Sequence, residues 1–406
     1  MTDIVESAEV STLLDELTRA AGREDPYPRY HRLREISPLV RADDGAIVVT
    51  GHADCAAVTR DQRLGHMPSH MLDFVSPGWS DHPALVQLFT SILTLNPPDH
   101  TRLRRLVSSS FTPRRVEALR PRIERMVDDL LDDMAKQGAG VDFVTAFAFP
   151  LPVNVIGELL GVPEPDRAQF QHLVRDWTQV LERVDADVLA TADPAAARIR
   201  SYLSELADQR RREPTDDLIS ALVAAGEDGD KLSADELVTM AGLLFAAGFE
   251  TTTNLLANSL VALLHDPGQL ALLRDDPGPA RSAVDELLRY DSPVQLLARV
   301  AWEDVELAGV PIEGGERIVA YLGAGNRDPR RFTDPDRLDL TRSDNAPLSF
   351  GGGIHYCLGA PLARMEAEIA LPALVRRFPE LAPAGDPGRR DSLTLRGFTS
   401  MPVTVG

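Results

Sequence analysis

Cysteine is almost absent from this chain of 406 residues, which contains only Cys55 and Cys357. Two cysteines cannot form the set of disulfides that holds small secreted proteins together. They also do not make a zinc site, because Cys55 and the scattered histidines do not supply three or four ligands at short spacing. The acidic start MTDIVESAEV lacks the basic and apolar regions of a signal peptide. These absences favour a protein of the reducing cytoplasm that has no membrane anchor.

Lysine is also scarce, and negative charge exceeds positive charge. Only Lys136 and Lys231 are lysines, so 42 minus 2 leaves 40 arginines, and the formal net charge is -20. A protein that binds nucleic acid in general needs a basic surface, so the sequence argues against that class. Arginine without lysine, together with abundant Ala, Leu, Asp and Pro, is typical of a GC-rich bacterial genome.

Helical patterns predominate along the chain. Residues 1–24 are predicted to form a polar tail with one short amphipathic segment, and residues 97–136 two helices that are interrupted at Phe111, Thr112 and Pro113. Short strands are expected at residues 46–50 and after Tyr290. No repeat or linker separates folding units, so residues 25–406 are predicted to form one large domain, mainly α with a small β region.

A long helix is predicted near the middle of the chain, beginning at a capping box formed by Ser233 and Glu236. It is apolar around its circumference from residue 237 to 264, which indicates burial, except for the polar run at 250–254. This interruption argues against a transmembrane helix. Two interpretations of the run stay open. In the first, Thr251 donates a hydrogen bond to a carbonyl of its own helix, and Glu250 reaches the surface or an arginine. In the second, the two residues form a proton relay beside a ligand.

The stretch FGGGIHYCLG, residues 350–359, places Cys357 just before another predicted helix. The first turn of a helix offers N–H groups and a positive dipole end, which lower the pKa of a thiol that binds a metal. The three glycines allow a tight turn and a close approach to a flat ligand. A buried inert thiol, or a nucleophile with His355 as its base, remains an alternative at this point.

The residues of this stretch resemble a known family. Phe350, Gly351, Gly353, His355, Cys357 and Gly359 are similar, at every fixed position, to the haem-binding signature of the cytochromes P-450. AGFETT (247–252), ELLR (286–289) and NRDPRRFTDPDRLDL (326–340) resemble, in the family's order, its oxygen-activation motif, its E-x-x-R pair and its meander. The resemblance extends from about Asp25 to the C-terminus and is closest to the soluble bacterial class.

The resemblance implies a haem b cofactor (iron protoporphyrin IX), with O2 as co-substrate and Cys357 as the thiolate on the iron. Thiolate ligation favours O–O cleavage. Glu250 and Thr251 would be catalytic and deliver protons. The remaining cofactor-binding residues would be His100, Arg104, Arg299 and His355 at the propionates, Phe350 and Gly359 near the sulfur, and the small residues Ala247 and Gly248 on the long helix. Glu286 and Arg289 would form a structural ion pair that Arg330 or Arg331 completes.

The implied activity is a monooxygenase that hydroxylates or epoxidises a medium-sized, mainly apolar small molecule in secondary-metabolite or antibiotic biosynthesis. Phe249 stands where this class often has His and would make the pocket roof more apolar. Candidate substrate-binding residues, placed by position, are Leu243, Leu244, Phe249, Val294, Gln295, Leu296, Phe398 and Thr399.

No part of the sequence resembles a flavin, nicotinamide or iron–sulfur module, so electrons are expected from a separate ferredoxin and ferredoxin reductase. The arginines at 102, 105, 114 and 115 are either a docking patch for the ferredoxin or a solvated helix face. Alternative activities that stay open are coupling, nitration or peroxide-driven oxidation, and non-catalytic haem binding.

Overall fold

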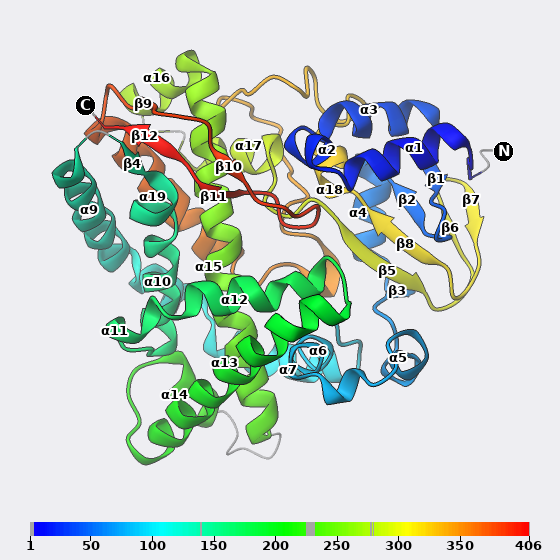
Figure 1. Cartoon of the computed structure of the whole chain (residues 1–406), viewed down its shortest axis with the longest axis horizontal. Helices are drawn as coiled ribbons and strands as arrows, with labels where there is room; N and C mark the ends of the chain where they lie inside the picture. Colours follow the sequence, from blue (N-terminus) through cyan, green and yellow to red (C-terminus); the bar gives the residue numbers. More distant parts are fainter. Residues whose placement is uncertain (1–3, 139, 225–231, 277, 279, 406) are drawn as a thin grey trace.

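Helices make up most of the molecule in the computed structural model, which describes residues 4–138, 140–224, 232–276, 278 and 280–405. The main sheet lies beside the N-terminal helices, and the other strands include a group near the C-terminus (Figure 1). The fold is therefore mainly α with a small β region, as the sequence predicts.

The helices alternate with short turns over most of the chain. They are α1 (Ala8–Leu17), α2 (Ala20–Glu24), α3 (Tyr27–Ile36), α4 (His52–Arg60), α5 (Ser69–Val75), α6 (Pro83–Phe89), α7 (Asp99–Ser110), α8 (Pro113–Ala118), α9 (Arg120–Gln137), α10 (Pro150–Leu160), α11 (Glu164–Arg167), α12 (Phe170–Thr178), α13 (Ala186–Arg212), α14 (Leu218–Ala224), α15 (Ala234–His265), α16 (Pro267–Asp275), α17 (Ala280–Tyr290), α18 (Leu322–Gly325) and α19 (Ala360–Arg377). The break predicted at Phe111 is confirmed, because α7 ends at Ser110 and Thr112 caps α8.

Strands from distant parts of the chain form the main sheet. Its order is β1 (Leu39–Arg41), β2 (Ile47–Val49), β8 (Arg317–Ala320), β5 (Leu297–Ala301) and β3 (Leu64–Gly65), and only the β2–β8 pair is parallel. Smaller sheets pair β6 (Val305–Leu307) with β7 (Val310–Ile312), and β4 (Val141–Asp142) and β9 (Ala382–Pro383) with β12 (Pro402–Thr404). β10 (Gly388–Arg389) and β11 (Phe398–Ser400) form a C-terminal hairpin.

The short amphipathic segment predicted within residues 1–24 is helix α1, and it packs against the rest of the protein instead of forming part of a tail. Helix α1 is capped by Ser7, and Val10 and Leu17 on this helix are completely buried. Val5 also forms a bridge to Val40 at the edge of the main sheet. The apolar residues of the segment are few, but they lie on the side that contacts α3 and the sheet, so composition alone hides the packing.

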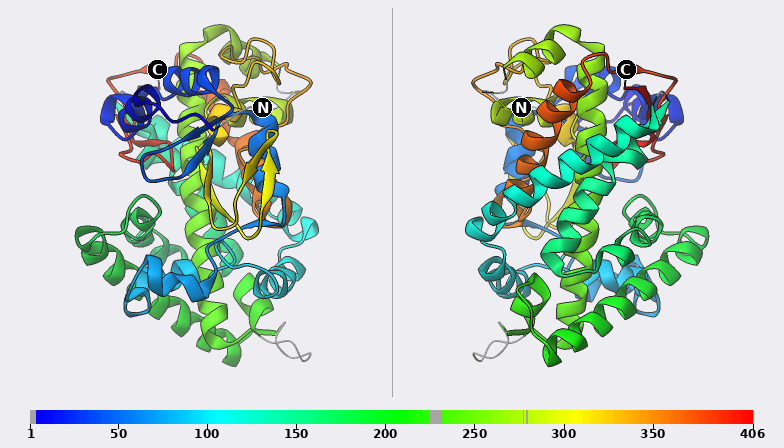
Figure 2. Two further views of the ribbon diagram at one scale, coloured as in Figure 1. Left: turned by 90° about the vertical axis from the view of Figure 1, so that its right-hand side faces the viewer. Right: turned by 90° about the vertical axis from the view of Figure 1, so that its left-hand side faces the viewer.

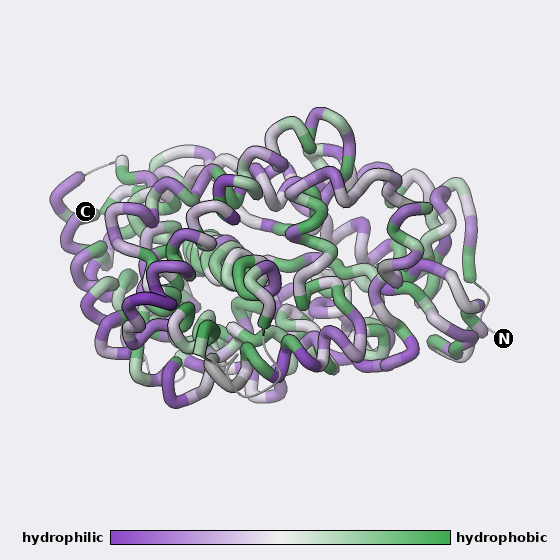
Figure 3. Tube along the Cα trace, turned by 90° about the horizontal axis from the view of Figure 1, so that it is seen from below, coloured by the Kyte–Doolittle hydropathy of each residue, from purple (hydrophilic) through white to green (hydrophobic). Residues whose placement is uncertain are grey.

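Helix α15 runs through the interior of the molecule, and α10, α13 and α19 pack against it (Figure 2). The predicted capping box is present: the Glu236 N–H donates to Ser233 Oγ over 3.1 Å, and the Ser233 N–H donates to Glu236 Oε2 over 2.7 Å. Its 32 residues give a length of about 48 Å. Seen nearly end-on, the helix is surrounded by other segments and is mainly hydrophobic (Figure 3). Even so, no described helix is both long and apolar enough to cross a membrane.

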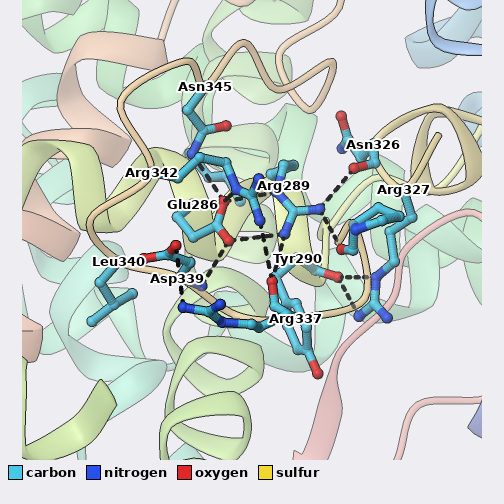
Figure 4. Close-up of polar contacts among 12 residues, drawn as sticks. Glu286, Arg289, Tyr290, Asn326, Arg327, Arg337, Asp339, Leu340, Arg342 and Asn345 are labelled. Carbon is cyan, nitrogen blue, oxygen red and sulfur yellow. Dashed lines mark hydrogen bonds and ion pairs between the residues drawn. The ribbon is translucent and has the colours of Figure 1, made fainter. Parts of the chain in front are cut away.

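The E-x-x-R pair forms a buried ion pair at the end of α17 (Figure 4). Both side chains are completely buried, and Arg289 donates from Nε and Nη2 to the two carboxylate oxygens of Glu286 over 2.7 and 2.8 Å. Arg289 Nη1 also donates to the carbonyls of Asn326 and Pro335 over 2.9 and 2.7 Å. A fully paired charge of this kind holds the irregular 326–345 segment against α17.

The partners that complete this pair are not the predicted ones. Arg342 Nε and Asn345 Nδ2 both donate to Glu286 over 3.1 Å. Arg330 instead pairs with Asp328, and Arg331 with Asp344. The third arginine is Arg342, eleven residues after Arg331 and twelve after Arg330. The prediction was wrong because the path of an irregular segment cannot be derived from its spacing.

Candidate functional site

The glycines of residues 350–359 shape the cysteine loop. Gly351 and Gly353 have φ values of 67° and 61°, which side-chain-bearing residues rarely adopt, so the predicted tight turn is present. A Cβ on Gly352 would lie 2.5 Å from Thr59 Oγ1, and one on Gly353 would lie 2.6 Å from the Thr59 carbonyl oxygen. Gly352 and Gly353 therefore permit a close approach to the end of α4, and the predicted approach to a flat ligand stays a prediction.

Cys357 lies between this turn and the start of α19, with its N–H donating to the Phe350 carbonyl over 3.0 Å. Burial raises the pKa of the thiol, and the backbone N–H groups of Gly359 and Ala360 and the charge of Arg104 act in the opposite direction. The N–H groups at the start of α19 thus lower the pKa of the Cys357 thiol, as predicted, but the increase that burial causes is larger. A positive ion at the sulfur would reverse that balance.

A cluster of histidines and arginines from four parts of the chain lies close to the cysteine loop. The rings of His100 and His355 are 4.2 Å apart, and the ring of His66 is 4.8 Å from that of His355. Arg299 on β5 is buried, and Arg104 donates to the Tyr356 carbonyl over 2.7 Å. His66, the member that sequence analysis did not single out, precedes α5, where no motif surrounds it.

The electrostatics of this donor cluster favour an anion. Burial and nearby arginines lower the pKa of His100 to about 4 and that of His355 to about 3, and burial lowers the pKa of Arg299 to about 10. Both ring nitrogens of His100 and Nε2 of His355 are buried without a hydrogen-bond partner among the described residues. With these pKa values each imidazole is neutral at pH 7 and has one N–H donor, which is costly to leave unpaired. These N–H groups and the guanidinium groups of Arg104 and Arg299 fit the two carboxylates of the haem that the family resemblance implies.

One stripe of α15 is open although the helix lies in the interior. Ala247 is exposed, and Leu244, Gly248 and Thr251 are partly exposed, whereas the residues around them are buried. The spacing of 3, 4 and 7 residues places them on one side of the helix. A Cβ on Gly248 would lie 2.7 Å from Ile156 of α10, so its small size also serves helix packing. The stripe agrees with a bulky ligand lying against Ala247.

The acid and the alcohol of the polar run make different contacts. Thr251 Oγ1 donates to the Ala247 carbonyl over 3.0 Å. Glu250 is buried and forms an ion pair with Arg390 of the C-terminal hairpin. Both contacts are those of the structural interpretation, and no direct hydrogen bond joins Glu250 to Thr251 among the described residues. Arg390 was not identified from the sequence, because it lies 140 positions after Glu250.

The candidate substrate residues divide according to their burial. Leu244 belongs to the open stripe, and Leu243 is buried beside it. Phe249 is completely buried and packs edge-on against Phe149 and Phe245, with ring centroids 5.5 and 5.6 Å apart. Its predicted place in the pocket roof is therefore wrong, because its position in the helix turns it toward the aromatic core.

Two of the later candidates are also placed elsewhere. Gln295 is buried, accepts from the Tyr30 hydroxyl over 3.2 Å and donates to the Ser292 carbonyl over 2.7 Å, so its polar groups are satisfied by the protein. Phe398 is buried beneath the guanidinium of Arg389 at 4.0 Å.

The other three candidates keep some exposed surface. Thr399 is exposed on β11, and Val294 and Leu296 are partly exposed next to β5. Their role toward a substrate stays a prediction.

Comparisons with known proteins agree with this geometry. The family model described as "Cytochrome P450" matches residues 73–276 and 280–404. The chain is 43% identical to cytochrome P450 107B1 of Saccharopolyspora erythraea, covering 95% of this chain and 96% of the relative. It is 41% identical to 6-deoxyerythronolide B hydroxylase of the same organism, covering 97% and 99%. The crystal structure of P450BioI in complex with an acyl carrier protein ligated to hexadec-9Z-enoic acid is similar, with a TM-score of 0.88, 38% identity, and 95% and 99% of the two chains covered.

The cysteine loop, the donor cluster and the open stripe of α15 thus occur in a chain whose relatives match it over nearly its full length. The protein belongs to the cytochrome P450 family and is a P450 monooxygenase, an oxidoreductase whose family implies a haem-thiolate cofactor.

Proposed function

We propose that this monooxygenase inserts one oxygen atom into a medium-sized, mainly apolar small molecule of bacterial secondary metabolism, by hydroxylation or epoxidation. The donor cluster around His100 is the observation that carries the assignment of the haem site, because it places buried imidazole nitrogens without a protein partner beside arginines, a combination that suits an anionic ligand. The substrate class is supported by relatives, one named 6-deoxyerythronolide B hydroxylase and one named polyketide biosynthesis cytochrome P450 PksS. Both cysteines of the chain are free thiols, which agrees with a place in the cytoplasm.

In this proposal Cys357 binds the iron, and His100, Arg104, Arg299 and His355 hold the propionates. Haem with a thiolate ligand supplies the oxygen-activation chemistry. The reduced, CO-bound absorption spectrum tests the ligand. We expect the long-wavelength Soret band of thiolate ligation in the wild type and its loss in Cys357→Ala. The same band in Cys55→Ala serves as the control, and a band that survives in Cys357→Ala would contradict the assignment.

Glu250 and Thr251 are proposed to deliver protons on the distal side. Thr251 lies on the open stripe of α15, and its hydroxyl can leave the Ala247 carbonyl at the cost of about one hydrogen bond. Thr251→Ala should lower the product formed per reducing equivalent and leave the CO-bound band unchanged. Thr252→Ala is a matched control, because Thr252 makes the same back-bond, to Gly248, but is buried. Equal yields in the two variants would contradict the relay.

Electrons are proposed to come from a separate ferredoxin and its reductase. The surface at the cysteine loop exposes the side chains of Ile354 and Tyr356 beside α7, on which Arg105 is exposed, and this combination suits a partner that is acidic and partly apolar. Of the predicted patch, Arg102 pairs with Glu236 and Arg115 lies 3.6 Å from Asp216, and Arg105 and Arg114 are exposed.

Charge reversal tests this docking surface. Arg105→Glu should slow reduction by the ferredoxin, and the effect should shrink at high salt. Unchanged reduction in the variant at low salt would place the docking surface elsewhere.

The substrate itself is best identified by binding spectra. We expect neutral polyketide and fatty-acyl compounds to perturb the spectrum, and small charged metabolites to have no effect. Turnover with reduced nicotinamide alone and no partner protein would contradict the electron route.

A further inference from the structure

A row of polar side chains follows one side of α15, next to the open stripe. Glu250, Asn254 and Asn258 are spaced four residues apart and are all buried. This row faces the C-terminal hairpin, since Asn258 Nδ2 donates to the Arg396 carbonyl over 3.1 Å. The hairpin approaches so closely that a Cβ on Gly397 would lie 2.0 Å from Asn254 Oδ1. The hairpin, coloured red, crosses α15 in Figure 1.

Arg390 connects this hairpin to the acid at the end of the row. Its guanidinium forms the ion pair with Glu250, and the side chains of Arg390 and Glu250 are only 12% and 10% exposed. Its backbone N–H donates to the Gly397 carbonyl over 3.0 Å, which fixes its place in the hairpin. Burial lowers the pKa of Arg390 to about 10, so it stays charged at neutral pH. A buried carboxylate without such a partner would be costly.

The same hairpin is held by α12 and the turn that follows it. Arg390 Nη2 donates to Thr178 Oγ1, the last residue of α12, over 3.2 Å. Glu182 accepts from the Ser392 hydroxyl and from the backbone N–H groups of Leu393 and Thr394, the latter two over 3.1 and 3.0 Å. The carboxylate of Glu250 is therefore placed by a guanidinium whose own position depends on these contacts.

We propose that Arg390 is a positioning residue of the monooxygenase reaction, which holds the Glu250 carboxylate for proton uptake, and that Glu182 supports it by fixing the hairpin tip. The inference rests on the proposed role of Glu250 in proton delivery. It adds a residue from a different element, and it makes the efficiency of the reaction depend on the contact between the hairpin and α12.

The test compares Arg390→Gln with Arg389→Gln in the holoenzyme. Arg389 is the neighbouring hairpin arginine, stacks on Phe398 and does not pair with Glu250, so it controls for damage to the hairpin. Arg390→Gln should lower product formed per reducing equivalent and increase the solvent deuterium isotope effect, because a group misplaced by about 1 Å can lose up to about a hundredfold in efficiency. Arg390→Lys should restore part of the loss. The CO-bound band and ligand affinity should stay at wild-type values.

Glu182→Gln should produce a smaller loss together with faster amide hydrogen exchange at residues 390–394, a readout that does not depend on turnover. If Arg390→Gln behaves like Arg389→Gln, or if exchange changes in Glu182→Gln without any loss of product yield, the proposal is overturned.

A double-mutant cycle shows whether Arg390 acts through Glu250. In a Glu250→Gln background, Arg390→Gln should have little additional effect, because the two changes remove one interaction. A full additional loss would overturn the inference. If Glu250→Gln uncouples the enzyme and Arg390→Gln does not, only the inference is wrong. If Glu250→Gln keeps the wild-type product yield, the proton-delivery role itself is wrong, and the inference falls with it.

Discussion

Neutralising Glu286 should destabilise the protein more than any single surface change. The carboxylate is completely buried and accepts from Arg289 through two nitrogens, from Arg342 and Asn345, and from the N–H of Asp339 over 2.9 Å. Glu286→Gln keeps the size of the side chain and removes the charge. The guanidinium of Arg289, also completely buried, would then lack its counter-ion.

The size of the effect follows from these contacts. Removing one partner of a buried ion pair costs about 3–5 kcal/mol. The entropy of unfolding is about 2.1 cal/mol/K per residue, which for 406 residues is about 0.85 kcal/mol/K. The expected decrease in the melting temperature of Glu286→Gln is therefore about 4–6 °C. Glu117→Gln is the matched control, because Glu117 also pairs with an arginine three residues later but is 62% exposed, and it should shift the temperature by less than about 1 °C.

The assay is thermal unfolding of the purified holoenzymes at one scan rate, with haem content measured on the same samples. We also expect a lower haem content in Glu286→Gln, since the pair holds the segment that leads into the cysteine loop. Arg342→Gln provides a milder step in case Glu286→Gln does not fold. It removes one charged hydrogen bond at a cost of about 1.5–3 kcal/mol, or about 2–3.5 °C. The reasoning is refuted if the melting temperatures of Glu286→Gln and Arg342→Gln both lie within about 1 °C of that of the Glu117→Gln control.

Two further predictions concern the cysteine loop and helix α19. Gly353→Ala should be more destabilising than Gly351→Ala, because both residues have positive φ but only a Cβ on Gly353 would lie against Thr59. Unfolding in urea measures the difference, and equal midpoints for the two variants would contradict the prediction. Burial raises the pKa of Glu366 well above its usual value of 4.5, so its contribution to stability is present below that value and is lost as pH rises toward the folded-state pKa. Glu366→Gln should therefore gain stability relative to wild type as pH increases above about 4.5, and a difference in melting temperature that does not vary with pH would contradict this.

Sequence patterns predicted the parts of this fold that depend on local rules. The capping box at Ser233 and the break before Pro113 are set by backbone hydrogen bonding within a few residues, so short-range reasoning suffices. The turn at Gly351 and Gly353 belongs to the same class, because positive φ is a property of single residues. The loop around Cys357 could accordingly be placed before any tertiary contact was known.

The contacts that sequence analysis missed are those between distant segments. Arg390 reaches Glu250, and His66 joins His100 and His355, only because several elements pack around α15. The third arginine of the E-x-x-R pair was misplaced for a related reason, since an irregular segment has no repeat from which its path can be derived. Periodicity tells which side of a helix is buried, but not which neighbour covers it.

One property of the site could have been derived from helix geometry alone. Adjacent residues of an α-helix point about 100° apart, so Glu250 and Thr251 can contact different neighbours of the helix. Thr251 shares the open stripe with Ala247, whereas Glu250 shares its side with Asn254 and faces the hairpin. In the proposed relay, a proton that passes from the acid to the alcohol would therefore move around the helix, and the pairing of Glu250 with Arg390 would set where that path begins.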